Sequence, residues 1–221
     1  MIKIRDTDHM EYMEGMEKSD HSIMNKVLKM TDEYDYRRYN AIDVKNVLNK
    51  ETLGAEDLAV LLSPSAEPLL EKMARRAKIE TAKHFGNTVC MFTPLYIANY
   101  CENYCVYCGF NCSNKIRRGK LSIDEIESEY KTISETGLRE ILLLTGESKS
   151  ASPVEYIAEA VSLAKKYFST IGVEVYPMNS DEYAVLRKAG ADFVSVYQET
   201  YNTVKYEEVH LRGPKRVFPY R

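Results

Sequence analysis

Apolar side chains in the first third of the chain recur every three to four positions, the spacing of amphipathic helices. This pattern predicts helices at 22–30, 43–48, 58–62 and 66–85, the last of them ended by Gly86. We therefore expect residues 1–86 to form an N-terminal helical region.

From residue 87 onward, short uninterrupted apolar runs alternate with amphipathic segments. The runs predict buried strands at 89–92, 140–144, 173–176 and 193–197. Helices are expected between and after them, at 122–136, 152–168, 181–189 and 202–209. Ser122 and Glu125 have the spacing of a capping box, and Pro153 suits the first turn of its helix.

Alternating strands and helices with short connections are typical of parallel β/α units, so the expected fold class is α/β. A doubly wound sheet and a (β/α) barrel share this pattern. No G-x-G-x-x-G motif follows the first strand and no Gly-Lys-Ser/Thr phosphate loop is present, so the main signals of dinucleotide and nucleoside triphosphate sites are lacking. A complete barrel takes about 250 residues, so a barrel here would hold only about its first four units.

Composition and charge exclude several classes of partner. The 221 residues are 44% apolar and 29% charged, as in ordinary globular proteins, and the net charge is −3. Near-neutrality provides no electrostatic argument for a nucleic acid or an anionic membrane. No apolar stretch approaches the roughly 18–20 residues of a membrane span, and the acidic, polar residues 1–20 are unlike a targeting signal. We expect a cytoplasmic protein with neither partner.

Four of the five cysteines fall within twelve residues, in a reducing compartment where clustered thiols more often bind a metal than form disulfides. Cys101, Cys105 and Cys108 form C-x-x-x-C-x-x-C just after the first predicted strand. Soft thiolates suit an iron–sulfur cluster, and three ligands for four irons leave one iron open for reaction. A zinc site that uses Cys112 as fourth ligand is the alternative, although structural zinc sites usually separate two cysteine pairs by a longer stretch. Cys90, on an apolar run, is expected in the core.

The cysteine triplet, with Tyr107 before its last cysteine, resembles the radical S-adenosylmethionine (SAM) superfamily. Longer strings are similar to the tyrosine lyases of the ThiH type, the 2-iminoacetate synthases of thiamine biosynthesis: PLYIANYCENYCVYCGF at 94–110, LTGE at 144–147, YQETY at 197–201 and HLRGPKR at 210–216. The resemblance covers about residues 58–221. It implies a TIM-type barrel over 87–221 without its C-terminal half, and an N-terminal part of such a lyase. We expect a lone half-barrel to expose apolar strand edges and to be weakly active or inactive.

The resemblance also implies cofactors and roles. Cys101, Cys105 and Cys108 would ligate a 4Fe–4S cluster whose fourth iron binds the amino and carboxylate groups of SAM, and one electron would release a 5′-deoxyadenosyl radical. That radical would start the cleavage of the Cα–Cβ bond of L-tyrosine, giving p-cresol and 2-iminoacetate. An electron donor of the flavodoxin or ferredoxin type and the thiazole synthase of the pathway are the expected protein partners.

Within the matching segments, further residues are assigned to the cofactor and the substrate. Thr145, which stands where the wider superfamily has glycine, Gly146 and Glu147 would accept hydrogen bonds from the methionyl ammonium. Tyr107 would contact the adenine through its backbone, or shield the cluster. The remaining candidates are Gln198 and Glu199 for ribose hydroxyls or amino-acid groups, Arg212 or Arg216 for a carboxylate, and Tyr96 and Asn99 for the substrate, whereas His210 is expected to be structural.

Two alternative functions remain open. One is the related tyrosine lyase of diiron hydrogenase maturation, which makes carbon monoxide and cyanide. The other is a non-catalytic zinc-binding module.

Overall fold

The computed structural model describes residues 8–221, which divide into two compact units. One unit consists of residues 26–90, and the other joins the segment that ends at Asn25 to residues 91–221. The segment before residue 26 belongs to the second unit because it bonds directly to it. The Tyr12 hydroxyl donates to the Pro219 carbonyl (3.0 Å), the Phe218 amide to the His9 carbonyl (2.8 Å), and the Ser180 amide to the Glu17 carboxylate (2.6 Å). The division therefore differs from the expected helical region of 1–86, of which residues 1–7 lie outside the described residues.

The unit of residues 26–90 is helical, as its hydrophobic spacing predicts. Helix α1 (Ser22–Glu33) leads into it, followed by α2 (Ala41–Leu48), α3 (Ala55–Leu61) and α4 (Leu70–Phe85). Asn40 caps α2 in a reciprocal capping box with Asp43. The expected helix at 66–85 begins only at Leu70, because Pro68 lies in a preceding 3₁₀ segment, Pro64–Leu69. A small core of Val44, Val47, Val60, Ala66 and Leu69 holds the helices together.

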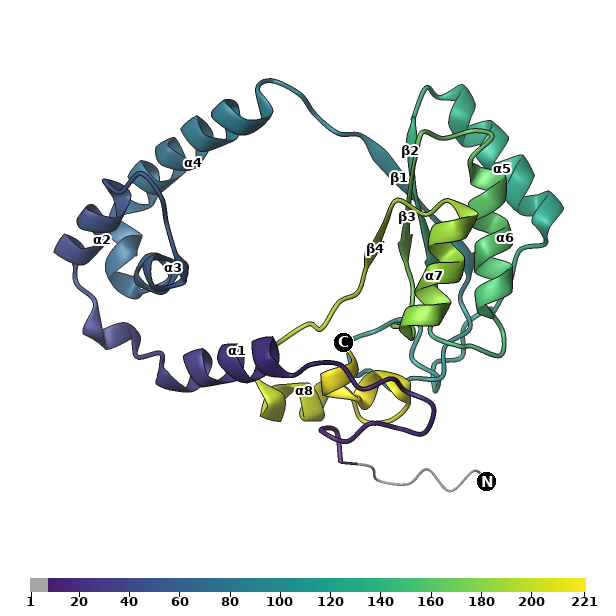
Figure 1. Ribbon diagram of the computed structural model, residues 1–221, viewed down its shortest axis with the longest axis horizontal. Coiled ribbons are helices and arrows are strands. Elements are labelled where there is room, and N and C mark those ends of the chain that lie inside the picture. The colour runs from purple at the N-terminus through teal and green to yellow at the C-terminus, as the bar shows by residue number, and fades with distance from the viewer. Residues whose placement is uncertain (1–7) are drawn as a thin grey trace. The chain divides into compact units, whose positions relative to one another are not determined.

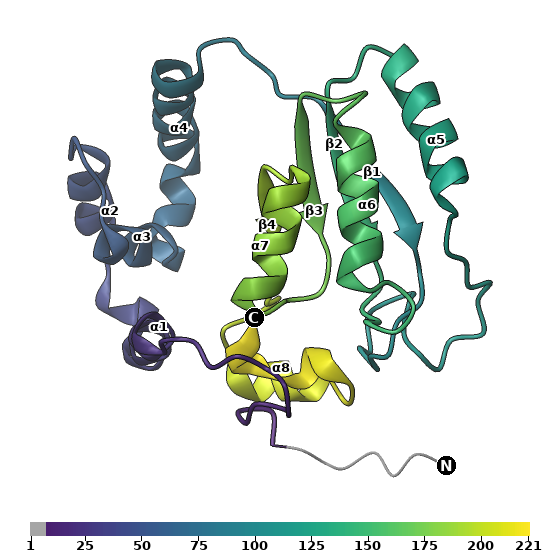
Figure 2. The same ribbon diagram turned by 45° about the vertical axis from the view of Figure 1, so that its right-hand side comes forward.

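The other unit is built on a four-stranded parallel sheet in the order β1-β2-β3-β4. The strands are β1 (Phe92–Ala98), β2 (Glu140–Thr145), β3 (Thr170–Glu174) and β4 (Phe193–Ser195). Helices α5 (Ile123–Glu135), α6 (Val154–Ala164) and α7 (Ser180–Ala189) connect them and lie on one side of the sheet, while α8 (Thr203–Val209) lies beyond the carboxyl ends of the strands (Figures 1 and 2). This arrangement confirms the α/β fold with four successive β/α units.

The two faces of this sheet differ because side chains alternate along a strand. Ile141, Leu143, Ile171 and Val173 face the helices and are at most 2% exposed in the main core. The register pairs Tyr96 with Leu144, Leu144 with Glu174, and Glu174 with Ser195, so these four residues form one row across the sheet. We call them the inner row. It lies at the carboxyl ends of the strands, where β/α proteins place their sites.

The expected first strand at 89–92 is wrong. Val89 and Met91 are exposed, as is Cys90, so the prediction of a core role for Cys90 is wrong as well. The strand begins at Phe92 and runs through Pro94, a residue that is tolerated because β1 lies at the edge of the four-stranded sheet.

Smaller shifts occur at other element ends. Strand β3 begins three residues and ends two residues earlier than the expected 173–176. Val175 and Tyr176 are buried beyond the strand end, so their apolar side chains resemble strand residues in the sequence. Pro153 is the N-cap of α6 rather than a first-turn residue, and α6 ends at Ala164, with Phe168 buried outside the helix. Strand β4 stops at Ser195, and Tyr197 beyond it is exposed. No helix within residues 8–221 combines the length and the apolar character that crossing a bilayer requires.

Candidate functional site

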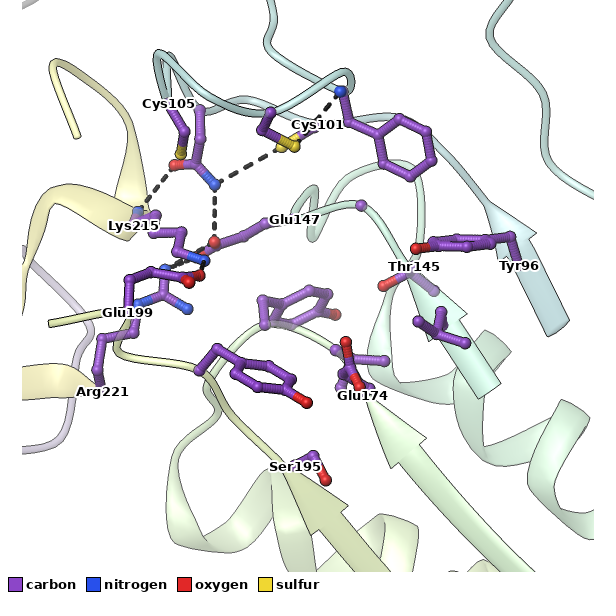
Figure 3. Close-up of a pocket in the computed structure, with 18 of the residues that line it drawn as sticks. Tyr96, Cys101, Cys105, Thr145, Glu147, Glu174, Ser195, Glu199, Lys215 and Arg221 are labelled. Carbon is purple, nitrogen blue, oxygen red and sulfur yellow. Dashed lines mark hydrogen bonds and ion pairs between the residues drawn. The ribbon is translucent and has the colours of Figure 1, made fainter. Parts of the chain in front are cut away.

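A cavity of about 200 Å³ opens at the carboxyl end of the sheet. The inner row lines it together with the cysteine loop, the turn after β2 and residues of the C-terminal segment (Figure 3). Cys101, Cys105 and Cys108 all reach this cavity, whereas Cys112 is exposed and is not among its lining residues. All five thiols are free, and burial raises the pKa of Cys105 to about 11, so a metal must displace a proton to bind that sulfur.

Backbone pairing with the C-terminal segment holds the cysteine loop. The Tyr104 amide donates to the Arg212 carbonyl and the Val106 amide to the Val209 carbonyl, both at 3.0 Å. Gly213 has φ +94°, and a Cβ there would lie 2.7 Å from the Glu102 carbonyl oxygen. Only glycine combines this conformation with such a close approach, so the Gly-Pro-Lys turn can pack directly against the cysteine loop.

The turn after β2 also contacts the cysteine loop closely. The Gly146 amide donates to the Ala98 carbonyl (3.0 Å), and the Glu102 amide donates to the Glu147 carbonyl (2.9 Å). A Cβ on Gly146 would collide with the carbonyl oxygen of Tyr100 and lie 2.8 Å from its carbon. The Thr-Gly-Glu string therefore needs glycine at its centre for packing reasons alone.

Glu147 is held by partners on both sides. Its carboxylate accepts from Asn103 Nδ2 (2.7 Å) and from one terminal nitrogen of Arg221 (2.9 and 2.7 Å). The Arg221 side chain is only 3% exposed. Burial alone would lower the pKa of Arg221, but the charge of Glu147, together with Tyr206 and the hydrogen bonds to both residues, outweighs it and raises that pKa. The pair is therefore a buried salt bridge at the edge of the cavity.

Tyr107 is oriented by His210. The Tyr107 hydroxyl lies 2.7 Å from Nε2 of His210, whose Nδ1 lies 2.9 Å from the Tyr206 carbonyl. A carbonyl can only accept, so Nδ1 carries the proton and Nε2 accepts from Tyr107. Burial lowers the pKa of His210 to about 4, which keeps the ring neutral, and this arrangement agrees with the expected structural role.

Glu199 is the one non-glycine residue with a positive φ (73°) within the part of the chain that the structure describes. Its carboxylate bonds Lys215 Nζ at 2.6 Å. Burial works to raise the pKa of Glu199, but its hydrogen bond to Lys215 and the charge of that ammonium group together lower it. Such backbone strain is typical of functional sites.

Most of the site residues expected from the sequence line this cavity, including Tyr96, Tyr107 and Glu199. Three do not. The amide of Asn99 bonds the Arg117 carbonyl and the Gly119 amide, the Gln198 amide bonds the Phe218 carbonyl, and Arg212 is exposed. Arg216, the alternative to Arg212, donates to Glu207 (2.6 Å) and to the His210 carbonyl (3.1 Å).

Sequence reasoning missed Glu174, Lys215 and Arg221, all of which line the cavity. Glu174 ends β3, where β/α proteins place functional residues, but the apolar run predicts a strand to residue 176 and so hides this position in the sequence. Lys215 lies in a short 3₁₀ helix (Pro214–Arg216) and Arg221 follows another (Phe218–Tyr220), where the sequence carries no comparable signal.

The chemistry of the lining fits an iron–sulfur cluster with an organic ligand. Within residues 8–221 no three His, Cys, Asp or Glu side chains converge on a point that one metal ion could occupy. A cubane cluster distributes three thiolates over three irons, so it does not need that convergence, whereas zinc does. Thr145 Oγ1 and Arg221 Nε are buried without a hydrogen-bond partner, and both residues line the same cavity. These two groups leave hydrogen-bonding capacity for a ligand in the cavity.

Comparison with known proteins identifies relatives of the chain. The family model of the radical SAM superfamily matches residues 95–216. The chain is 41% identical over 181 residues to 2-iminoacetate synthase of Escherichia coli (strain K12), covering 82% of this chain and 48% of that protein. It is 33% identical to 3-methylornithine synthase of Methanosarcina acetivorans, covering 72% of this chain and 46% of that protein.

Solved structures show the same relationship. The crystal structure of HydG, a maturase of the [FeFe]-hydrogenase, superposes with a TM-score of 0.76 at 28% identity, covering 92% of this chain and 47% of that one. The crystal structure of methylornithine synthase (PylB) superposes with a TM-score of 0.65 at 28% identity, covering 80% and 54%. The chain thus spans about half the length of the relatives it matches.

Proposed function

Because the chain belongs to the radical SAM superfamily, we propose that it acts as a tyrosine lyase of the 2-iminoacetate synthase type, cleaving the Cα–Cβ bond of L-tyrosine to 2-iminoacetate and p-cresol. The observation that carries this proposal is the 41% identity to 2-iminoacetate synthase over 82% of the chain. Three cysteines that open on one cavity agree with it.

Membership of the superfamily implies a 4Fe–4S cluster and SAM, which together supply one-electron reduction and a radical that abstracts hydrogen. In our proposal, Cys101, Cys105 and Cys108 hold the cluster, and the raised pKa of Cys105 means that loading it releases a proton. Thr145 Oγ1, which is buried without a partner, would bond the methionyl group. Arg221 orients the Glu147 carboxylate through their salt bridge.

The inner row would form the floor of the substrate site. Tyr96 stacks edge-on against Phe110 with ring centroids 5.2 Å apart, and both line the cavity. Aromatic walls of this kind suit a phenol ring. The strand ends thus hold the substrate on one side of the cavity, and the cysteine loop lies on the other.

The partners and the location are part of the proposal. One-electron reduction of a cluster needs a donor, and a flavodoxin or ferredoxin fits that need. The thiazole synthase of thiamine biosynthesis is the proposed consumer of 2-iminoacetate, and the cytoplasm is the proposed location.

A second candidate is the lyase of diiron hydrogenase maturation, which the likeness to HydG favours (TM-score 0.76). Identity to that structure is lower, at 28% against 41% for 2-iminoacetate synthase.

Product analysis separates the candidates. The protein, reconstituted anaerobically with iron, sulfide and SAM, is reduced in the presence of isotopically labelled L-tyrosine. We expect labelled p-cresol and 2-iminoacetate, which hydrolyses to glyoxylate, without carbon monoxide or cyanide, and at the low rate expected of four β/α units alone. Carbon monoxide or cyanide would support the second candidate, and reductive cleavage of SAM with tyrosine left intact would contradict both.

A further inference from the structure

The cavity contains one carboxylate that the proposed chemistry has not used. Three acids line it, Glu147, Glu174 and Glu199, together with two cations, Lys215 and Arg221. Glu147 is paired with Arg221, and Glu199 is paired with Lys215. Among the described residues the Glu174 side chain has no hydrogen bond or ion pair, so three acids and two cations leave one excess negative charge in the cavity.

The position of Glu174 follows from the sheet register. It is the last residue of β3 and belongs to the inner row, between Leu144 and Ser195. Figure 3 shows its carboxylate directed into the space between the strand ends and the aromatic side chains. Burial raises the pKa of Glu174, as expected for a carboxylate that lacks a partner in a partly desolvated site.

Glu174 lies apart from the turn assigned to SAM. Its register partner is Leu144, so Glu174 is one position deeper in the sheet than Thr145. Glu147, on that turn, instead contacts the cysteine loop through Asn103. Besides the Glu199–Lys215 pair, the cavity therefore has an acid beside the cysteines, Glu147, and an acid among the strand ends, Glu174.

The surroundings of Glu174 match an aromatic amino acid. Tyr96 occupies the same row, and the charge of Glu174 contributes, after burial, to a raised pKa of the Tyr96 hydroxyl. Tyr197 lines the same cavity. An amino acid that enters this apolar space carries an ammonium group, which must find an anionic partner to offset its desolvation.

We propose that Glu174 binds the α-ammonium group of the amino-acid substrate. This inference rests on the proposed function. It adds the residue that makes the site prefer an amino acid to the same carboxylic acid lacking the amino group. The carboxylate of Glu174 accepts hydrogen bonds from the ammonium group, and the aromatic side chains enclose the ring.

The test compares two ligands and three proteins by equilibrium binding without reductant, so that no turnover occurs. The ligands are L-tyrosine and 3-(4-hydroxyphenyl)propionate, which lacks only the amino group. The proteins, each loaded with cluster and SAM, are the unaltered chain, Glu174→Gln, and the matched control Glu159→Gln, whose residue is exposed on α6. Far-UV circular dichroism verifies that each variant is folded.

We expect Glu174→Gln to weaken L-tyrosine binding by about 10- to 100-fold, the loss of a charge-assisted hydrogen bond, and to change binding of the deaminated acid by less than about 3-fold. Glu159→Gln should bind both ligands as the unaltered chain does, and Glu174→Asp should recover part of the preference for tyrosine.

Three results for Glu174→Gln would overturn the assignment of Glu174 and leave the proposed function intact. These are unchanged binding of tyrosine, an equal loss of binding for both ligands, and a loss of SAM binding instead. Equal binding of the two ligands by the unaltered chain would likewise overturn the assignment of Glu174 alone, whereas an unaltered chain that binds no L-tyrosine would contradict the proposed function and this inference with it.

Discussion

At the scale of single residues, close approach and burial determine how the cavity is built. Gly146 leaves no room for a Cβ beside Tyr100, and Gly213 lies close to the Glu102 carbonyl. Arg221 and Glu147 form a nearly dry ion pair at its edge. The positions of the cysteines therefore depend on residues far from them in the sequence.

Replacement of Gly146 by alanine should displace the cysteine loop, because the new Cβ overlaps the Tyr100 carbonyl. We expect a loss of about 1–3 kcal/mol in the free energy of unfolding, as for other overpacked sites, and less iron bound after anaerobic reconstitution. Gly119→Ala is the control, since nothing lies within 4 Å of a Cβ there. Equal iron content in both variants would refute this account of the turn.

Replacement of Arg221 by methionine leaves Glu147 buried beside the cavity without its cation. Breaking a buried pair in this way costs about 3–5 kcal/mol, measurable as a lower urea midpoint. Lys205→Met, which removes an exposed partner of Glu208, should cost about 0.5 kcal/mol or less. A similar small cost for both variants would show that Arg221 does not stabilise Glu147.

At the scale of elements, local signals predicted much of the fold. The capping box at Ser122 and Glu125 opens α5 where the sequence places it, with the Glu125 amide donating to Ser122 Oγ at 3.2 Å. Strand β2 matches its apolar run to within one residue. Strand β1 was placed too early, because residues 89–92 form the more apolar run while Pro94 argues against a strand. That strand is stabilised by pairing with β2, a contact that the local pattern does not contain.

Loss of the α5 cap should be measurable. Ser122→Ala removes the side chain that accepts from the Glu125 amide, so we expect the free energy of unfolding to fall by about 1 kcal/mol. Ser128→Ala, on the exposed face of the same helix, should be neutral or slightly stabilising, by about 0.5 kcal/mol at most, because alanine favours helix. Denaturant titration of both variants measures the difference, and a larger loss for Ser128→Ala would contradict the assignment.

At the scale of the whole molecule, two units with separate cores make up the described chain. The cysteine motif and the Thr-Gly-Glu turn could be recognised from the sequence because their residues are adjacent in the chain. Glu174, Lys215 and Arg221 could not, since only the parallel register and the course of the C-terminal segment bring them to the same cavity. Asn99 was expected in the site because it precedes the cysteines, but its amide stabilises the 117–119 backbone instead.

Separate cores predict that damage to one unit spares the other. Val44 is fully buried in the unit of residues 26–90, so Val44→Ala should destabilise that unit by about 1.5–3 kcal/mol. Hydrogen exchange should accelerate in α2 and α3 while protection in β2 and β3 and the bound iron stay unchanged. Loss of iron in this variant would mean that the cluster site depends on the helical unit.

The most direct test of the central claim, that three cysteines alone hold a cluster in the cavity, is the iron and sulfide content of anaerobically reconstituted Cys112→Ser beside Cys105→Ser. We predict about four irons and four sulfides per chain in Cys112→Ser, as in the unaltered chain, and a large loss in Cys105→Ser. Metal that disappears with Cys112, or that proves to be zinc in the unaltered chain, would contradict the claim.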